Sequence, residues 1–305
     1  MHFRRSELEQ LRSPRPITVL AGRLQQPRTL AIALVVLLAL AACQPASSAT
    51  QSQAVPSAST SSPTPTPDPT PDLNEISAMF DIGGGRELYL QCAGNGSPTI
   101  LLEAGDESGS WWDIAPELIQ QTRTCAYDRA GNGRSVDAAG CRQLADLLGD
   151  LEALLEVAEV DPPYLLVGGS GGGYLMASLA ARRPTDVAGL VLVETPKAIT
   201  IMSPELEAAI SCDAPNNVEH RDYYAIEHAV WDNRALIGDF PMTIISNDYG
   251  DSAPPGDEET NVEDQRGWLV LSPNSKQVVV TSGHLVEPGL VVDEILAVLE
   301  AAQQP

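Results

Sequence analysis

The chain from about residue 74 onward alternates short apolar runs with amphipathic stretches. Most of the runs are continuously apolar rather than alternating, which is typical of strands in a sheet that is covered on both faces. The runs predict strands at Arg86–Cys92, Thr99–Glu103, Cys125–Tyr127, Tyr164–Val167, Gly189–Val193, Thr243–Ser246 and Gln277–Val280.

Between these runs, apolar residues recur at helical spacing. In RQLADLLGDLEALLEVAEV (142–160), six leucines lie three or four positions apart, which places them on one face of a helix. A second helix is predicted to begin at Gly171, and a last one covers LVVDEILAVLEAA (290–302). Strands that alternate with helices predict an α/β fold with a mostly parallel central sheet flanked by helices.

The connection between the strands at 189–193 and 243–246 is longer than a simple crossover. Two stretches in it, SPELEAAI (203–210) and HRDYYAIEHAVWDNRAL (220–236), have a helical pattern. We therefore predict a small helical lid inserted at about 197–240. Its aromatic residues could line an apolar substrate pocket or simply serve packing.

The N-terminal segment has the pattern of an export signal. Six arginines precede Leu30–Ala42, an unbroken run of 13 apolar residues that is shorter than the about 20 needed to span a bilayer. Leu40-Ala41-Ala42-Cys43 resembles the lipobox of bacterial lipoproteins, in which cleavage leaves Cys43 as the lipidated first residue. Residues 1–42 are thus predicted to be a lipoprotein signal peptide, with an ordinary secretory signal or a buried helix as the alternatives. The charged lead is longer than in most such signals, which leaves a downstream start codon open.

Residues 43–73 are rich in Pro, Ser and Thr and have too few apolar side chains to offset the entropy of ordering. They are predicted to be an extended, lipid-anchored linker. The remaining residues, 74–305, suffice for one domain with a sizeable core. The expected location is the extracytoplasmic face of the cell membrane.

The composition is strongly acidic, with 41 Asp and Glu against 18 Lys and Arg and a net charge of −23. Removal of residues 1–42 would take away six arginines but only two glutamates, so the remaining domain would be more acidic still. Such a surface repels nucleic acid, anionic headgroups and strongly anionic substrates. We expect no nucleic-acid partner, and the sequence does not indicate an oligomeric state.

Four cysteines follow the one at position 43: Cys92, Cys125, Cys141 and Cys212. An exported domain permits disulfides, and four cysteines allow three full pairings. The sequence does not choose among these pairings, and free buried thiols are also open.

Five glycines surround one serine in YLLVGGSGGGYLMASLAARRP (164–184). A phosphate-binding P-loop requires Lys and then Ser or Thr after its last glycine, but Tyr174 and Leu175 follow Gly173. The pattern that fits is Gly-x-Ser-x-Gly between an apolar strand and an amphipathic helix, which presents a nucleophilic serine on a sharp turn. Ser170 is therefore the predicted nucleophile, with a plain glycine-rich turn as the alternative.

A nucleophilic serine needs a base, and the folded part contains three histidines. His220 and His228 lie in the predicted lid, where solvated or capping roles are the default. His284 follows the strand at 277–280 in SGHLVEPG, a loop before the last helix. In this architecture the histidine comes from that loop, after the serine and the acid in chain order, so His284 is the predicted general base.

With these motifs in place, residues from about Phe80 to Ala302 resemble the α/β-hydrolase family. The stretch ILLEAGDESGSWWDIAPEL is similar to its oxyanion loop, CAYDRAGNGRS to the next strand and loop, and LSPNSKQVVVTSGHLVEP to its histidine loop. The resemblance implies Ser170 as nucleophile, His284 as base and the backbone N–H groups of Gly171 and Asp106 as the oxyanion hole.

The chain departs from the family's common pattern at two places. The early loop reads Glu-Ala-Gly-Asp rather than His-Gly, and Gly169 stands where a histidine often precedes the serine. Glu103, Asp106 and Glu107 therefore place carboxylates near the position of a developing oxyanion, which would oppose catalysis unless they point away.

Three carboxylates are candidates for the acid that orients the histidine. Asp248 follows the strand at 243–246, from whose end the family usually takes its acid, and Asp251 lies three residues further. Glu194 ends the strand at 189–193, from which some relatives, including certain haloalkane dehalogenases, take theirs. Each could instead cap a helix or be a solvated loop carboxylate.

The sequence thus predicts a membrane-tethered serine hydrolase of the carboxylesterase type that forms an acyl-enzyme on a small, neutral or apolar substrate and needs no cofactor and no metal. A serine at the elbow disfavours the relatives with an aspartate nucleophile, the dehalogenases and epoxide hydrolases. Peptidases and perhydrolases of the same fold remain alternatives. A non-catalytic surface lipoprotein that uses the fold as a binding module is the alternative from another class, favoured by the acidic loop.

Overall fold

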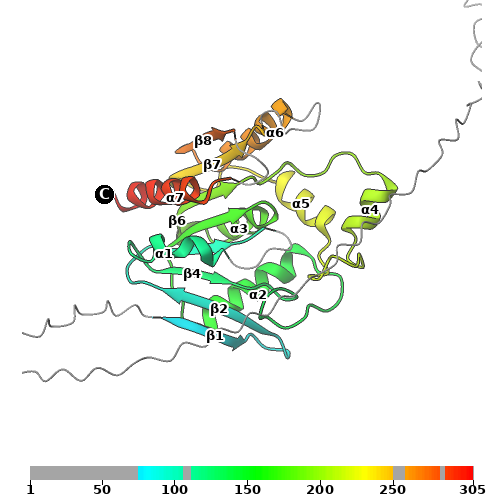
Figure 1. Cartoon of the computed structure of the whole chain (residues 1–305), viewed down its shortest axis with the longest axis horizontal. Helices are drawn as coiled ribbons and strands as arrows, with labels where there is room; N and C mark the ends of the chain where they lie inside the picture. The colour runs from blue at the N-terminus through cyan, green and yellow to red at the C-terminus, as the bar shows by residue number, and fades with distance from the viewer. Residues whose placement is uncertain (1–74, 106–110, 250–257, 282–285, 305) are drawn as a thin grey trace, which may run out of the picture. The chain divides into compact units, whose positions relative to one another are not determined.

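One eight-stranded sheet organises the residues that the computed structural model describes, 75–105, 111–249, 258–281 and 286–304. The strand order is β1-β2-β4-β3-β5-β6-β7-β8 (Figure 1). The strands are β1 Ile76–Asp81, β2 Glu87–Ala93, β3 Thr99–Glu103, β4 Thr124–Tyr127, β5 Tyr164–Gly169, β6 Val187–Val193, β7 Met242–Asn247 and β8 Ser275–Val280.

The seven predicted strands are all present, with ends that differ by up to two residues. An additional strand, β1, forms an antiparallel hairpin with β2, and β2 pairs antiparallel with β4; the other neighbouring strands are parallel. The prediction of a mostly parallel α/β sheet is therefore confirmed. Sequence analysis missed β1 because most of its residues are exposed, so it has no continuous apolar run.

The helices lie on both faces of the sheet (Figure 1). Leucines at 147, 148, 151, 154 and 155 form the buried face of α2, as their spacing predicts. The α-helices are α1 Ala115–Leu118, α2 Leu144–Val157, α3 Gly171–Arg182, α4 Pro204–Ile210, α5 Tyr223–Trp231, α6 Glu258–Gln265 and α7 Pro288–Gln303. Among the described residues, the 3₁₀ segments are η1 Trp112–Ile114, η2 Pro184–Asp186 and η4 Arg266–Leu271.

Each central strand divides its side chains between two cores, because successive residues of a strand point to opposite faces. Leu166 of β5 and Leu190 of β6 pack on the face covered by α2 and α3, whereas Val167 and Val191 pack on the face covered by α1 and α7. Both faces of these strands are buried, which explains their continuous apolar runs.

The segment between β6 and β7 carries α4 and α5, within the predicted lid. The helix at the second predicted stretch is shorter than the pattern indicated, because Asp222 caps its N-terminus by accepting a 3.0 Å hydrogen bond from the N–H of Ala225. A main-chain bridge joins Arg221 to Arg142, the residue two before α2. The middle of this segment is thus fastened to the rest of the domain.

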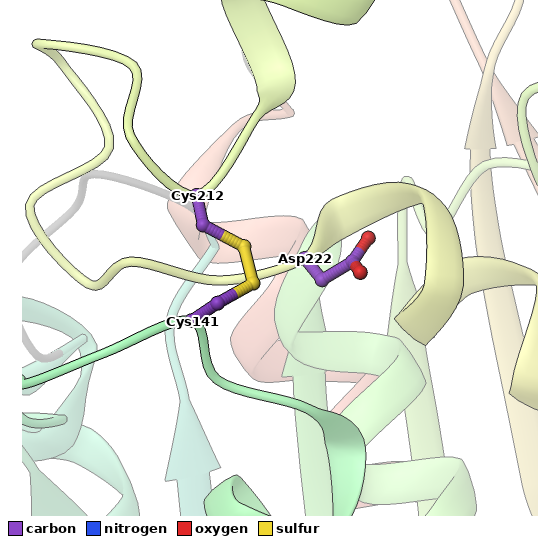
Figure 2. Close-up of side chains that lie close together, drawn as sticks. All are labelled: Cys141, Cys212 and Asp222. Atoms are coloured by element: carbon purple, nitrogen blue, oxygen red, sulfur yellow. A yellow bond between two sulfur atoms is a disulfide. The ribbon is translucent and has the colours of Figure 1, made fainter.

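Two disulfides are formed. Cys92 and Cys125 are cross-strand neighbours on β2 and β4, and both are fully buried. Cys141, which precedes α2, joins Cys212, which follows α4 (Figure 2). One of the three pairings allowed by the sequence is thereby selected.

The predicted signal peptide and linker, with Cys43, lie outside the described residues. Of the helices that the structure describes, none combines the length and the apolar character needed to cross a bilayer.

Candidate active site

Ser170 lies at the turn between β5 and α3, at the carboxyl end of the sheet. Its backbone has φ 46° and ψ −125°, a conformation that costs a non-glycine residue of order 1–3 kcal/mol. The turn is held from both sides, because the Ser170 N–H donates to Val193 O at 2.7 Å and its carbonyl accepts from the Gly173 N–H at 3.0 Å. The side chain is exposed and makes no capping bond to its own helix. This is the geometry that presents a serine hydroxyl to a substrate.

The glycines before the serine permit close contacts on two sides. A Cβ at Gly168 would lie 2.6 Å from the Cα of Gly173, so the strand and helix can approach only without a side chain there. A Cβ at Gly169 would lie 2.2 Å from two ring atoms of Trp111. The indole of Trp111 therefore occupies the space of the side chain that often precedes the nucleophile in the family, and this accounts for the departure at position 169.

The residues that follow β5, β6 and β7 lie next to one another along one edge, because the three strands are parallel neighbours. Each of these residues donates its N–H to the adjoining strand: Ser170 to Val193 O, Glu194 to Ile245 O and Asp248 to Val280 O, at 2.7, 2.8 and 2.9 Å. The structure thus brings the predicted nucleophile and two of the three predicted acids to the same edge.

Asp248 is directed toward β8 and the segment that follows it. Its Oδ2 accepts a 2.9 Å hydrogen bond from the hydroxyl of Thr281, the first residue after β8. His284 lies three positions beyond Thr281 and, like Asp251, is outside the described residues. The carboxylate of Asp248 is therefore at the start of the segment that carries the predicted base.

Glu194 has a different set of contacts. It has a positive φ of 50°, and its Oε2 accepts from the hydroxyl of Tyr249 at 2.5 Å. Its Oε1 accepts from the N–H of Asn247 and from Nε2 of Gln265 at 3.2 Å. Burial and the neighbouring Glu194 carboxylate raise the pKa of Tyr249 well above its ordinary value. Glu194 thus joins the ends of β6 and β7 to α6.

The two described histidines have structural partners. Nδ1 of His220 lies 2.9 Å from Cys212 O. His228 places Nδ1 2.8 Å from Asp232 Oδ2 and Nε2 2.8 Å from Ile199 O. Both partners of His228 are hydrogen-bond acceptors, and these hydrogen bonds raise the pKa of the ring. The partners of both rings thus come from the segment between β6 and β7.

Glu103, one of the carboxylates expected to oppose an oxyanion, is buried and pairs with the guanidinium of Arg129. Its charge is thereby compensated from within the domain. Of the two predicted oxyanion donors, Gly171 begins α3 at the elbow, whereas Asp106 and its neighbour Glu107 lie outside the described residues. Sequence analysis quoted Arg129 only as part of the motif CAYDRAGNGRS and did not assign its side chain a role.

A cavity of about 550 Å³ lies among α2, α3, α5 and η4. The residues of α3 that line it are Ala177, Ser178, Ala181 and Arg182, all in the second half of the helix, whereas Ser170 precedes the first. The cavity is therefore separate from the elbow.

One group of potential metal ligands occurs among the described residues, formed by Cys141, Cys212 and Asp222 (Figure 2). The two sulfurs are joined in a disulfide, so neither is available as a thiolate. The carboxylate of Asp222 accepts hydrogen bonds from Ala225 N–H and from Gln143 Nε2. These residues do not fit a metal site.

Comparison with known proteins agrees with this architecture. Residues 97–244 match the family model described as the alpha/beta hydrolase fold. The chain has the α/β-hydrolase fold. The resemblance of the sequence to this family is thereby confirmed, and the resemblance supports a hydrolase activity.

Individual relatives of this α/β-hydrolase are distant. The uncharacterized protein YqjL of Bacillus subtilis is 23% identical, over 63% of this chain and 82% of its own length. A pimeloyl-[acyl-carrier protein] methyl ester esterase of Nitrosospira multiformis is 33% identical over 35% of this chain and 42% of its own length. Apart from the Bacillus protein, the curated relatives that match are covered over less than half of their length.

Among solved structures, a thermophilic esterase from Thermogutta terrifontis is similar with a TM-score of 0.56 and 19% identity. The match covers 75% of this chain and 99% of that one. At this level of identity the likeness shows a shared fold.

Proposed function

We propose that this α/β-hydrolase is a serine hydrolase that cleaves an ester-like acyl bond of a small, neutral or apolar substrate. The observation that carries the proposal is the strained, exposed position of Ser170 between β5 and α3, with its hydroxyl not engaged in capping the helix. The esterase named among the relatives supports an ester as the substrate class. The acidic composition disfavours a strongly anionic substrate.

In the proposed reaction, Oγ of Ser170 attacks the carbonyl carbon while His284 takes the hydroxyl proton. The N–H groups of Gly171 and Asp106 would stabilise the tetrahedral oxyanion. His284 then passes the proton to the leaving alcohol, which departs and leaves an acyl-enzyme. A water molecule activated by His284 attacks the acyl carbon, and the carboxylic acid is released as Ser170 regains its proton.

Asp248 is the proposed acid of the triad. It follows the strand from which the family usually takes this residue, and its hydrogen bond to Thr281 places it at the start of the segment that carries His284. Glu194, in contrast, already accepts three hydrogen bonds from β7, Tyr249 and α6, which favours a structural role.

The test uses the full chain, a fluorophosphonate probe and a series of p-nitrophenyl esters. We expect labelling and turnover in the wild type and neither in Ser170→Ala. Ser178→Ala is the matched control, because this serine lies on α3, the helix that follows Ser170, and its hydroxyl donates to Tyr174 O; it should retain both activities. Equal inactivity of the wild type and Ser170→Ala would favour the non-catalytic binding module. Turnover of peptide or perhydrolysis substrates in place of esters would favour a peptidase or a perhydrolase of the same fold.

We further propose that the domain is held at the extracytoplasmic face of a membrane by a lipid on Cys43. The apolar run, the small residues and the cysteine of the N-terminal segment support this proposal. Cys43→Ser should release the protein from the membrane fraction, and unchanged retention would refute the anchor.

A further inference from the structure

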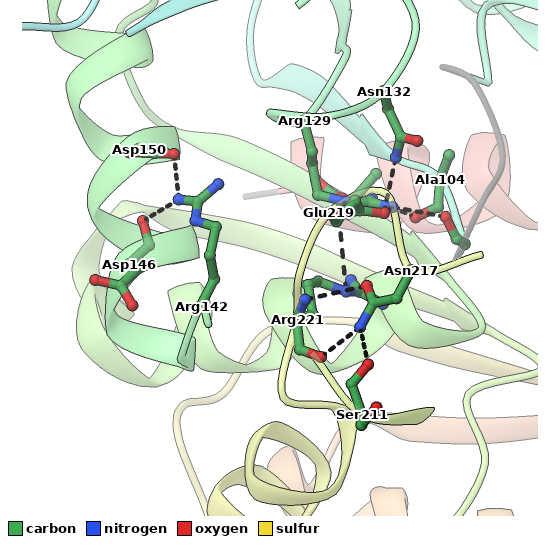
Figure 3. A network of polar contacts seen from close by, with 12 residues as sticks. Ala104, Arg129, Asn132, Arg142, Asp146, Asp150, Ser211, Asn217, Glu219 and Arg221 are labelled. Carbon is green, nitrogen blue, oxygen red and sulfur yellow. Dashed lines mark hydrogen bonds and ion pairs between the residues drawn. The ribbon is translucent and has the colours of Figure 1, made fainter. Parts of the chain in front are cut away.

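The guanidinium of Arg129 holds the backbone of the loop that follows β3. Nη1 donates to the carbonyl of Ala104 and Nη2 to that of Gly105, each at 2.8 Å (Figure 3). These two residues lead directly into position 106, whose N–H is the second proposed oxyanion donor. The contact to the Gly105 carbonyl therefore holds the backbone immediately before that position.

Two buried carboxylates in turn fix the guanidinium. Glu103, the last residue of β3, pairs with Nη1. Glu219 receives a bidentate pair, with Nε to Oε2 at 2.7 Å and Nη2 to Oε1 at 2.8 Å. The side chains of Glu103 and Glu219 are each 1% exposed and that of Arg129 is 5% exposed. Planar bidentate pairing of this kind sets the orientation of the guanidinium as well as its position.

The pairing also keeps Arg129 charged. Burial alone lowers the pKa of Arg129, but the facing carboxylates of Glu103 and Glu219 outweigh burial and raise it well above its ordinary value. Burial raises the pKa of Glu103, and the guanidinium opposes this effect. The three side chains therefore depend on one another for their charges.

Glu219 comes from the segment between β6 and β7, and hydrogen bonds within and around that segment fix its position. Nδ2 of Asn217 donates to Ser211 O at 2.9 Å and to Arg221 O at 2.8 Å, which closes the chain into a turn around residue 219 (Figure 3). Nδ2 of Asn132 donates to Glu219 Oε1 at 2.7 Å. The backbone lies close against the loop after β4, since a Cβ at Gly131 would be 2.2 Å from Val218 O.

We propose that Glu219 is a positioning residue of the oxyanion loop: by orienting Arg129, the inserted segment sets the backbone at Ala104 and Gly105. This inference rests on the proposed serine-hydrolase function. Its consequence is that a residue distant from the nucleophile in sequence acts on the transition state, because an oxyanion donor stabilises charge that develops only there.

The test compares Glu219→Gln with the wild type in steady-state ester hydrolysis. Gln keeps the size of the side chain but removes the charge and one acceptor of the bidentate pair. We expect kcat to fall about tenfold, below the full loss of an oxyanion donor at about 10²–10³, with KM within about twofold. The affinity of a trifluoromethyl ketone, which forms the oxyanion adduct, should weaken by the same factor as kcat.

Two further variants separate positioning from stability. Glu227→Gln is the matched control, because this half-buried glutamate of the same segment accepts its hydrogen bond from the backbone, from Ile199 N–H at 3.0 Å; its kcat should stay at the wild-type value. Asn132→Ala removes only the amide that steadies Glu219, and it should reproduce the kcat loss in milder form even if Glu219→Gln fails to fold. Thermal melting is recorded for every variant.

The outcomes are distinguishable. A lower kcat with unchanged KM in Glu219→Gln or Asn132→Ala, and weaker ketone binding, supports the proposal. If both variants keep the wild-type kcat and ketone affinity and lose only thermal stability, the cluster is purely structural and the proposal is overturned. A wild-type chain that hydrolyses no ester and binds neither probe refutes the hydrolase function itself, and with it any role of Glu219 in that reaction.

Discussion

The hydroxyl of Thr281 donates a 2.9 Å hydrogen bond to the carboxylate of Asp248, which joins the end of β7 to the residue that follows β8. The triad acid must orient the histidine that comes from the segment after β8. Of the two described candidates, Asp248 makes this contact, whereas Glu194 is hydrogen-bonded to residues of β7, its following loop and α6. The two carboxylates lie at the same edge of the sheet but face different partners.

From this relationship, Asp248→Asn is expected to reduce kcat by about 10³–10⁴-fold, because the amide can no longer stabilise the imidazolium or fix the tautomer of His284. Glu194→Gln should cost far less activity and more stability, since it disturbs the junction of β7 and α6. Ester turnover and thermal melting of both variants, with Asp251→Asn alongside, check this prediction. Three small losses of turnover would contradict the triad assignment.

The contact between Trp111 and Gly169 predicts a specific coupling. Gly169→Ala places a methyl group within 2.2 Å of the indole, so it should lower the free energy of unfolding by about 1–3 kcal/mol. In a Trp111→Ala background the same substitution should cost clearly less, because the clash is gone. Denaturant unfolding of the four proteins of this double-mutant cycle gives the coupling. Additive effects would show that the indole does not restrict position 169.

The fold could be read from the sequence wherever burial is continuous along the chain. Val167, Val191 and their neighbours have both faces of their strands covered, so their segments are apolar throughout, and the elbow has a local motif at its junction. Strand β1 could not be read in this way, because most of its residues are exposed and, among the described residues, it pairs with β2 alone.

The surroundings of the elbow depend on contacts between distant positions. Glu103, Arg129 and Glu219 come from β3, the loop after β4 and the segment after β6, and no local pattern relates them. The sequence places the carboxylate of Glu103 near a developing oxyanion but does not reveal Arg129 as its partner. The pairing of Cys141 with Cys212 was open for the same reason. The sequence does contain one signal for this cluster: Glu103 is a charged residue at the end of an apolar strand, and a buried charge requires a partner.

The two disulfides should differ in their response to reductant. Cys141 is exposed whereas Cys92 and Cys125 are fully buried, so graded dithiothreitol under native conditions should open the Cys141–Cys212 bond first. Alkylation followed by mass spectrometry measures the order. Preferential alkylation of Cys92 and Cys125 would contradict this prediction.

Removal of the exposed disulfide by the double substitution Cys141→Ser, Cys212→Ser should destabilise the domain. The bond closes a loop with a sequence separation of 71, for which the chain-entropy estimate is about 4 kcal/mol. The native contacts from Arg142 to Arg221 and from Arg129 to Glu219 should keep the segment in place at moderate temperature. Denaturant unfolding measures the loss, and a change below about 1 kcal/mol would show that the cross-link does not constrain the unfolded chain as the entropy model requires.

The stability of α5 is expected to depend on pH through His228. The hydrogen bonds of this ring to Asp232 and to the carbonyl of Ile199 raise its pKa above the ordinary value of about 6.5. A group whose pKa is raised by folding contributes its stabilisation fully below the unfolded pKa and loses it as the pH rises through the folded pKa. His228→Asn should therefore lower the melting temperature most near pH 5.5, and the difference from the wild type should shrink toward pH 8.5.

The control is Asn233→Ala. The side chain of Asn233 also donates to a backbone carbonyl, that of Ala229, but it does not titrate, so the effect of this substitution should be constant over the same pH range. A melting difference for His228→Asn that is equally constant would mean that the ring does not titrate between its two acceptors.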